Sequence, residues 1–390
     1  MDKRKLLTIV LAVFVYLLST SLSYIFFSKT ASSQSLATPV AAPTSLANGQ
    51  LVFGNNLPKT EPCPLNGVLY SKEQRQWWEK HRPLGVMIEN HIDARPQSGL
   101  SFADVVYEAV AEGGITRFLS VFYCQDAGEV GPVRSARTYF LDFISEYGDN
   151  PLYTHVGGAN QAGPADALSQ IDSYGWGGYN DLNQFSIGFP TFWRDYDRLG
   201  HPAATEHTMY STTQKLWDYG ATQRGLTNVD KNGNLWSQKF VPYSFKDDAS
   251  LDARPKSQLV HLEFWSSQPD YFVDWVYDPA SNTYSRKNAG ALHIDRDTNK
   301  QLTTKNIVVL LMQQSSANDG YDNNLHLLFK DKGVGNAVIF MDGKQTKGTW
   351  QKDDRTSRTL IYDLAGNAIK FDRGTIWFDI LPTDGVINVN

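Results

Sequence analysis

VVYEAVAEGGITRFLSVFY, residues 105 to 123, predicts the centre of the fold. Two runs rich in apolar and β-branched residues flank Gly113-Gly114, and paired glycines between such runs are typical of a tight β-hairpin. A two-residue turn would give three cross-strand pairs: Glu112 with Ile115, Val110 with Arg117, and Glu108 with Leu119.

This hairpin would bring two acids and an arginine together. Side chains two residues apart in a strand share a face, so Glu108, Glu112 and Arg117 are expected to point the same way. Glu108 and Glu112 would still share a face if the segment were helical. Paired carboxylates can act as acid and base on glycosidic bonds, so these two are candidate catalytic residues. A structural ion-pair cluster is the competing interpretation.

GPVRSARTYF, residues 131 to 140, adds two more positive charges. Apolar residues recur at helical spacing after Pro132, which places Arg134 and Arg137 near the first turn of a predicted helix. Cations there oppose the helix dipole and need a negative partner. That partner is either a carboxylate of the protein, from Glu108, Glu112 or Glu129, or the carboxylate or phosphate of a ligand.

Two aromatic-rich loops form a second candidate surface. SYGWGGYNDLNQF (173–185) and TFWRDYDRLGH (191–201) interleave aromatic residues with Asn, Asp and Arg. Such surfaces suit stacking on sugar rings, although glycine-rich loops also bury their own aromatics to hold their shape.

The overall pattern predicts an α+β fold. The chain has 390 residues, enough for about two domains. Residues 62–245 mix strand and helix patterns, whereas residues 246–390 carry short strands separated by turn signals. We therefore expect a mixed α/β domain followed by a smaller all-β domain, a meander or partly closed barrel.

The N-terminus predicts a membrane anchor. Residues 6–27 contain no charged side chain and are long enough to span a bilayer. Residues 1–5 carry net positive charge, so they should remain cytoplasmic and the remainder should be extracytoplasmic. Residues 28–61 have the composition of a flexible linker. A cleavable signal peptide is the alternative.

Charge restricts the partners. The formal net charge is −5, and the first 29 residues carry +3, which leaves −8 for the rest. A general nucleic-acid or anionic-lipid binder would be basic, so nucleic acid is excluded as a partner. Any anionic ligand must be held in a local pocket.

Cysteine and histidine usage gives a disulfide but no metal site. Cys63 and Cys124 are the only cysteines, and in an oxidising compartment they are expected to pair, although two reduced thiols remain possible. None of the eight histidines has a recognised metal-binding spacing. The sequence therefore predicts no metal and no cofactor.

Several motifs resemble one known family. The stretches RPLGVMIENH (82–91), ARPQSGL (94–100), ADVVYEAVAEGGITRF (103–118), GPVRSAR (131–137) and HVGG (155–158), followed by MDGKQTKGTW (341–350), are similar to the YerB-like proteins. These are envelope proteins of mainly Gram-positive bacteria, usually lipoproteins, of unknown molecular function. The resemblance implies an α/β domain followed by a β-rich one and supplies no catalytic residues. This chain departs from the family by lacking a lipid-attachment cysteine, so residues 6–27 should anchor it.

Together these features predict a membrane-anchored envelope protein that binds an anionic cell-wall-type group in a glycan, peptide stem or phosphate. The predicted binding residues are Arg95, Arg117, Arg134, Arg137 and His155. One alternative is a peptidoglycan hydrolase or transferase that uses Glu108 and Glu112. The other is a scaffold for envelope protein partners.

Overall fold

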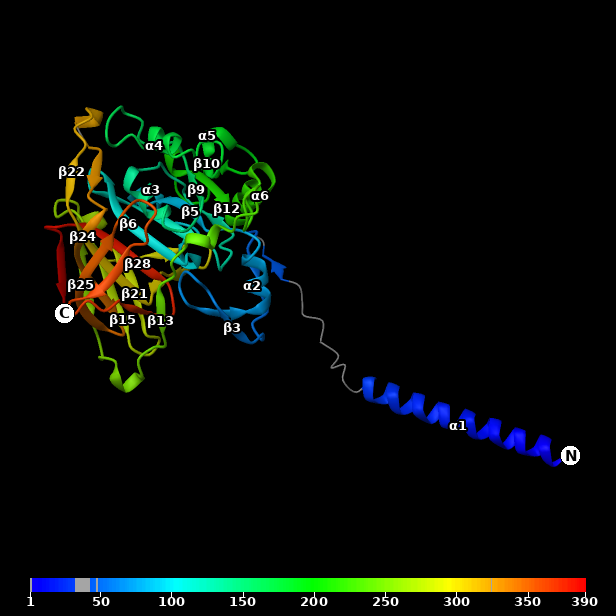
Figure 1. The fold of residues 1–390 in the computed structure, drawn as a ribbon. Helices are drawn as coiled ribbons and strands as arrows, with labels where there is room; N and C mark the ends of the chain where they lie inside the picture. The colour runs from blue at the N-terminus through cyan, green and yellow to red at the C-terminus, as the bar shows by residue number, and fades with distance from the viewer. Residues whose placement is uncertain (1, 32–42, 47, 324) are drawn as a thin grey trace. The chain divides into compact units, whose positions relative to one another are not determined.

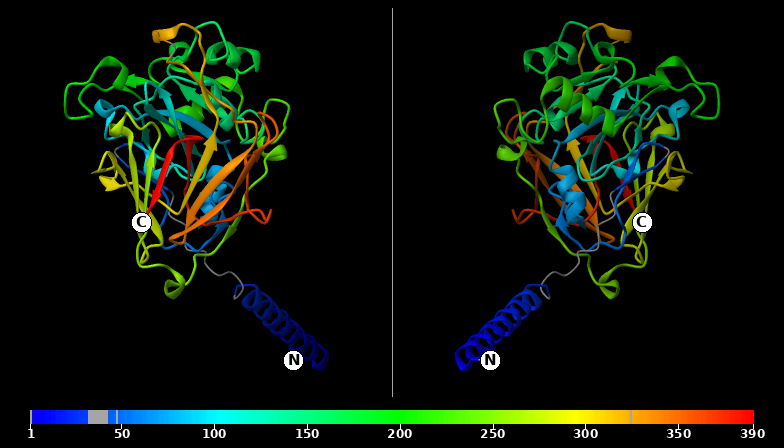
Figure 2. Two further views of the ribbon diagram at one scale, coloured as in Figure 1. Left: turned by 90° about the vertical axis from the view of Figure 1, so that its left-hand side faces the viewer. Right: turned by 90° about the vertical axis from the view of Figure 1, so that its right-hand side faces the viewer.

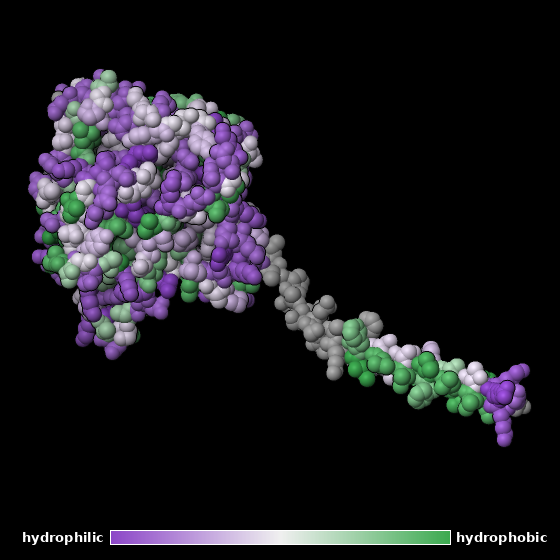
Figure 3. All heavy atoms as spheres, in the orientation of Figure 1, coloured by the Kyte–Doolittle hydropathy of each residue, from purple (hydrophilic) through white to green (hydrophobic). Residues whose placement is uncertain are grey.

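A computed structural model describes residues 2–31, 43–46, 48–323 and 325–390. The chain forms two compact units, residues 1–43 and 44–390. The first contains helix α1 (Lys3–Ala31), in which Lys3–Phe26 is long and apolar enough to cross a membrane. Figure 3 shows hydrophobic residues along this helix and hydrophilic residues at its N-terminal end.

The second unit is built on a ten-stranded sheet with the strand order β10-β9-β5-β7-β6-β28-β21-β24-β25-β26. The strands are β5 (Leu84–Glu89), β6 (Val105–Glu112), β7 (Ile115–Phe122), β9 (Leu152–His155), β10 (Asp181–Asn183), β21 (Asn306–Met312), β24 (Gly333–Met341), β25 (Lys344–Lys352), β26 (Leu360–Asp363) and β28 (Ile376–Pro382).

Both halves of the chain contribute to this sheet. Strand β28 lies parallel to β6 on one side and to β21 on the other. The central hairpin β6–β7 is therefore an interior pair, and its continuous burial matches this position. The predicted boundary at residues 245 and 246 falls within one compact unit and remains a prediction about domain organisation.

A second, six-stranded sheet packs on one face of the first. Its order is β17-β16-β15-β14-β29, and β20 pairs with β16. The strands are β14 (Leu259–Glu263), β15 (Val273–Asp278), β16 (Thr283–Asn288), β17 (Ala291–Leu292), β20 (Thr303–Thr304) and β29 (Val386–Val389). Trp275 of β15 meets Trp377 of β28 edge-on, with ring centroids 5.2 Å apart. The α+β class is confirmed, and the strands of the C-terminal half divide between the two sheets.

Helices lie against the opposite face and beside the sheet. They are α2 (Lys72–Trp78), α3 (Thr138–Ile144), α4 (Ala167–Ser173), α5 (Gln184–Ile187) and α6 (Thr213–Arg224). Phe143 of α3 stacks on Tyr107 of β6 at 4.9 Å, which fixes α3 against the sheet. Figures 1 and 2 show α4, α5 and α6, in green, at one end of the body, with β24 and β25, in orange, below them.

Short strand pairs complete the body. They are β1 (Thr44–Ser45) with β2 (Leu51–Val52), β3 (Lys59–Pro62) with β4 (Leu69–Ser71), β8 (Glu129–Val130) and β11 (Trp193–Arg194) with β12 (Met209–Thr212), β13 (Ser244–Lys246) with β27 (Lys370–Asp372), β18 (Ile294–Asp295) with β19 (Lys300–Gln301), and β22 (Gln314–Ser316) with β23 (Leu327–Phe329).

Part of the expected linker is ordered. The Leu51 amide donates to Asp126 Oδ2 at 2.7 Å, and the Gln50 side chain donates to the Asp126 carbonyl at 2.8 Å. These contacts with the buried Asp126 hold Gln50 and Leu51 against the body, which differs from the flexible spacer expected for residues 28–61. Residues 32–42 lie outside the described residues.

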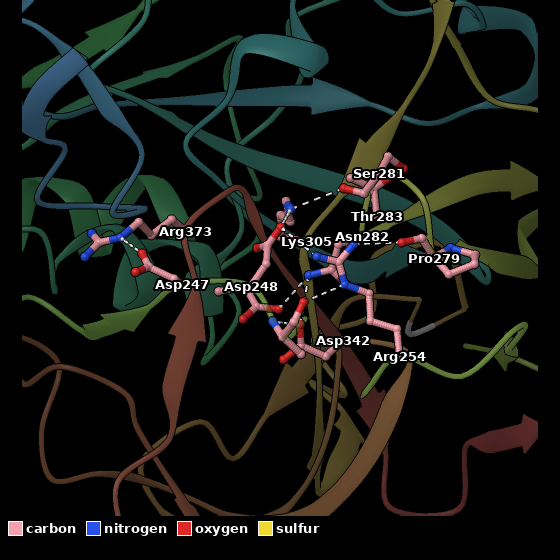
Figure 4. Close-up of polar contacts among 12 residues, drawn as sticks. Asp247, Asp248, Arg254, Pro279, Ser281, Asn282, Thr283, Lys305, Asp342 and Arg373 are labelled. Atoms are coloured by element: carbon pink, nitrogen blue, oxygen red, sulfur yellow. Dashed lines mark hydrogen bonds and ion pairs between the residues drawn. The ribbon is translucent and has the colours of Figure 1, made fainter. Parts of the chain in front are cut away.

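The polar stretch 246–258 is held by charge pairs (Figure 4). Asp248 accepts from Lys305 at 2.5 Å, and Asp342 accepts from Lys246 at 2.5 Å and from Asn282 at 2.8 Å. Each carboxylate in this cluster contacts a cation or an amide of the protein. The cluster therefore has a structural role and fixes this stretch to the body.

The predicted disulfide is present. Cys63 and Cys124 are joined with an S–S distance of 2.07 Å and a Cα–Cα distance of 6.0 Å. Both residues are buried, and the bond connects the segment before α2 to the end of the central hairpin.

Candidate functional site

The candidate site lies at one edge of the ten-stranded sheet. Strand β5 is parallel to β9, β9 is parallel to β10, and β5 and β6 are both antiparallel to β7. The carboxyl ends of β5, β6, β9 and β10 therefore meet at the same edge (Figure 1). Sheets of this kind commonly bind ligands beyond the carboxyl ends of their strands.

An extended segment crosses this edge. The Arg134 amide donates to the Met87 carbonyl of β5 at 2.9 Å, and the Arg134 carbonyl accepts from Val156, just after β9, at 3.0 Å. Helix α3 begins only at Thr138, with Arg137 as its N-cap. Placement of both arginines in a helical turn was therefore wrong, because pairing with β5 and with the loop after β9 outcompetes the local helical pattern.

A β-bulge separates the two candidate acids. Glu112 pairs with Ile115 as predicted, but the register shifts between Val110 and Glu112. Glu108 then bonds Thr116, whereas Glu112 bonds Arg117, the next residue on β7. Adjacent residues of a strand face opposite sides, so Glu108 and Glu112 lie on opposite faces. The expectation of a shared face was wrong.

Two arginines share Glu112. Arg117 Nη2 lies 3.3 Å from Glu112 Oε2, and Arg137 contacts Glu112 Oε1. Both arginines are nearly buried, and among the described residues their Nε groups have no hydrogen-bond partner. Burial lowers the pKa of both guanidinium groups from the ordinary arginine value. The pair therefore leaves one positive charge without a carboxylate.

Arg134 is held from one side only. Its Nε donates to Glu89 Oε1 at 3.0 Å, and Glu89 Oε2 lies 2.8 Å from His207 Nδ1. Burial would raise the pKa of Glu89, but the His207 hydrogen bond and the charges of Arg134 and Arg117 outweigh it and lower that pKa. The two terminal amino groups of Arg134 donate to no acceptor in the described part of the chain.

Two adjoining pockets share Arg134. One, of about 330 Å³, is lined by Glu112, Arg117, Arg134, Arg137 and Tyr321, with exposed Asp322 beside them. The other, of about 540 Å³, is lined by Arg134, Gly157, Phe185, Arg194 and Glu206. Ser135 also lines both, so we call the two together the carboxyl-edge groove. A pocket of about 480 Å³ elsewhere, lined partly by Glu263 and Asp384, has no cationic residue among the described residues that line it.

Two of the predicted binding residues line neither pocket. Arg95 donates to the Asp270 carbonyl at 2.9 Å and lies over Tyr271 at 5.2 Å. His155 is fully buried, with Nε2 2.5 Å from Asp181 and Nδ1 2.6 Å from the Gly157 carbonyl. Its contacts hold the glycine loop that lines the groove.

Glu108 belongs to the packing between the two sheets. Its carboxylate lies 2.8 Å from Arg286 Nη2 and also accepts from Thr116 at 2.8 Å, and both charged side chains are 0% exposed. Arg286 itself lies over Trp377 at 4.7 Å. A catalytic role for Glu108 gains no support from this position, because a substrate has no route to it in this conformation.

Asp379 adds a second acid to the same buried layer. It pairs with Glu108 across β28 and β6, and neither of its carboxyl oxygens has a hydrogen-bond partner among the described residues. Burial, together with repulsion from Glu108, raises the pKa of Asp379 well above its ordinary value. The raised pKa favours the protonated form of Asp379 in the folded state.

This protonation predicts how stability depends on pH. Above about pH 4 the unfolded state loses the proton that folded Asp379 keeps, so the free energy of unfolding should fall by about 1.4 kcal/mol per pH unit from this group. Asp379→Asn should remove that slope, measured by urea unfolding between pH 5 and 7. Asp247→Asn, at a side chain 92% exposed, is the control and should keep it. An unchanged slope in Asp379→Asn would refute the assignment.

Sequence reasoning missed Glu89 and His207, whereas Phe185 and Arg194, which line the larger pocket, come from the two aromatic-rich loops. Glu89 ends the apolar strand β5, which marks it as a polar residue at a strand terminus. His207 reaches Glu89 from far along the chain, and no local pattern indicates that contact.

Comparisons with known proteins agree with this architecture. Residues 67–227 match the family described as "Protein of unknown function (DUF3048) N-terminal domain", and residues 260–378 match its C-terminal domain. The chain is 28% identical over 323 residues to "Putative lipoprotein YerB" of Bacillus subtilis (strain 168), covering 82% of this chain and 86% of that protein. The crystal structure of YerB from Bacillus subtilis matches with a TM-score of 0.67 at 25% identity, covering 84% of this chain and 100% of that one. This chain therefore belongs to the YerB-like DUF3048 family.

Proposed function

We propose that this protein is a membrane-anchored envelope protein that binds an anionic cell-wall-type group in the carboxyl-edge groove. The observation that carries the proposal is Arg134, whose terminal amino groups have no acceptor among the described residues and which lines both pockets. A planar guanidinium with two free amino groups matches the two oxygens of a carboxylate or phosphate.

The surroundings favour an anion at this point. Arg117 and Arg137 share the carboxylate of Glu112, so two nearly buried guanidinium groups contact one acid. Asp322, the other acid that lines the smaller pocket, is exposed and forms no ion pair with them among the described residues. Phe185 is 74% exposed and lines the larger pocket, where it offers a flat apolar face beside Arg134. A ring next to a charged group fits an acidic saccharide, such as one from a wall glycan.

The proposed location is the outer side of a membrane. Helix α1 begins with Lys3, Arg4 and Lys5, ahead of its apolar run, so the positive-inside rule orients it with the N-terminus in the cytoplasm and the body outside. The Cys63–Cys124 disulfide fits an oxidising compartment. The relative from Bacillus subtilis is named a lipoprotein, which also suggests attachment at the cell envelope.

Calorimetric titration of the full-length chain in detergent tests the proposal, with muramyl dipeptide and inorganic phosphate as probes. Arg134→Ala should weaken binding of one or both probes by about tenfold to a hundredfold, as expected for a lost charge-assisted pair of about 1.5–3 kcal/mol. Arg75→Ala is the matched control, because Arg75 of α2 is 47% exposed and pairs with Glu61 of β3 and with Glu79.

Unchanged affinity in Arg134→Ala, with an intact fold, would remove the proposal. Binding of neither probe by the wild-type chain would also count against it and favour the scaffold alternative, which chemical crosslinking to protein partners in cells would then examine.

A further inference from the structure

Three metal-ligating side chains meet beside the groove. His91 follows β5, Asp93 lies in the turn η1 (Ile92–Ala94), and His207 ends the turn η3 (Thr205–His207). One potential ligand atom from each residue lies within 4.8 Å of the others. His91 Nδ1 is 3.7 Å from Asp93 Oδ2, and the two imidazole rings lie nearly parallel with centroids 4.8 Å apart.

The hydrogen bonds prepare His207 as a ligand. Its Nδ1 lies 2.8 Å from Glu89 Oε2, and Glu89 is held in turn by Arg134 at 3.0 Å. When Nδ1 donates to a carboxylate, the neutral ring presents a lone pair on Nε2. A carboxylate behind a histidine in this way is the usual outer support of a metal-bound imidazole. Within the described residues, His207 Nε2 has no hydrogen-bond partner.

The other two side chains can adjust to an ion. Asp93 is 63% exposed and His91 is 28% exposed. His91 Nδ1 now accepts the Asp93 amide at 3.2 Å, and an ion would replace that donor. Nitrogens on one tetrahedral Zn²⁺ are about 3.3 Å apart, given Zn–N bonds of about 2.0–2.1 Å, so a closure of roughly 1 to 1.5 Å is needed. The His91 ring must also turn out of its parallel stack on His207, because the lone pairs of two parallel rings do not point at one ion.

Local charge also favours a cation. Asp93, Glu89 and Glu206 surround His207, and the nearest positive groups are Arg134 on Glu89 and Arg194 on the Thr205 carbonyl and Thr208 hydroxyl. Arg117 also acts on Glu89, so three guanidinium groups balance the three carboxylates. The attraction for a cation comes from Asp93, which pairs with no arginine among the described residues and can serve directly as a ligand. The carboxylates and imidazoles together suit a first-row divalent ion.

We propose that His91, Asp93 and His207 bind a divalent transition-metal ion of the Zn²⁺ type, supported by Glu89. Three protein ligands leave at least one position for water or an anion, as in open zinc sites. The site is separate from the predicted anion contact, since none of the three ligands lines the carboxyl-edge groove. The sequence indicated no metal because His207 lies far from the His91-Ile92-Asp93 stretch.

The test uses the full-length chain without a histidine tag, stripped with a chelator. Titration with Co²⁺, read by its visible absorption, and with Zn²⁺, read by calorimetry, should show one equivalent bound. His91→Ala and Asp93→Asn should each weaken Zn²⁺ binding by at least about tenfold, and His207→Ala should abolish it.

His261→Ala is the matched control. His261 lies 2.7 Å from Asp274 and 3.4 Å from Glu263, so it tests whether a histidine between two acids is enough to bind Zn²⁺. His261→Ala should leave Zn²⁺ binding unchanged. Because His207→Ala removes a contact of the buried Glu89 and can disturb folding, the test depends on the Zn²⁺ affinities of the variants at the partly exposed His91 and Asp93. Ordinary zinc sites are occupied at a metal concentration of about 100 µM. The proposal would be overturned if the wild type bound no metal at that concentration. It would also be overturned if His91→Ala and Asp93→Asn both bound Zn²⁺ as tightly as the wild type.

Discussion

Replacement of Arg286 by methionine is expected to lower the free energy of unfolding by about 3–5 kcal/mol. Arg286 and Glu108 are both 0% exposed and lie 2.8 Å apart between the two sheets. Removing the cation leaves a buried carboxylate without its counter-charge. Urea unfolding at pH 7 followed by tryptophan fluorescence measures the change, because Trp275 and Trp377 both contact this arginine.

The double variant Arg286→Met with Glu108→Gln provides the control. Removing both charges together should recover part of the lost stability, since no uncompensated ion remains. A loss below about 1 kcal/mol in the single variant, or a double variant less stable than the single, would contradict the account of this pair.

Loss of the disulfide is expected to have an effect of similar size. The Cys63–Cys124 bond closes a loop with a sequence separation of 61 residues. On the loop-entropy model a bond of this span stabilises by about 4 kcal/mol, with measured losses of about 2–5 kcal/mol. The double variant Cys63→Ala, Cys124→Ala should therefore unfold at a clearly lower urea concentration than the oxidised wild type.

Unfolding in the presence of a reductant distinguishes the effect of the disulfide bond from the effect of replacing the two cysteine side chains. Adding it should destabilise the wild type and leave the double alanine variant unchanged. Equal unfolding midpoints for oxidised and reduced wild-type protein would show that the bond contributes little to stability.

Local sequence patterns predicted the central hairpin but not its register. Gly113-Gly114 correctly marked the turn, and Glu112 pairs with Ile115 as expected. The bulge before Glu112 then moved Arg117 opposite Ala109, because one extra residue shifts every pair beyond it. The alternation of apolar and polar side chains gave no sign of the extra residue in the bulge.

Long-range pairing also decided the placement of the arginines. The apolar spacing after Pro132 favours a helix, yet Arg134 pairs with Met87 and Val156 and is extended. Likewise, β28 inserts beside β6 although the two strands are far apart in the chain. Such partners are set by long-range tertiary contacts. The sequence therefore indicated Arg117, Arg134 and Arg137 as candidates but not the backbone conformation that places them in the groove.

The central claim is that Arg134 offers free donors to an anion. Nitrogen-15 NMR of arginine side chains in the full-length chain, titrated with inorganic phosphate and then with muramyl dipeptide, tests it most directly. The signal absent from Arg134→Lys identifies this residue. If Arg134 offers free donors, this signal shifts with at least one probe, while that of Arg286, fully buried against Glu108, does not. An Arg134 signal that stays in place with both probes, or moves no more than that of Arg286, would contradict the account.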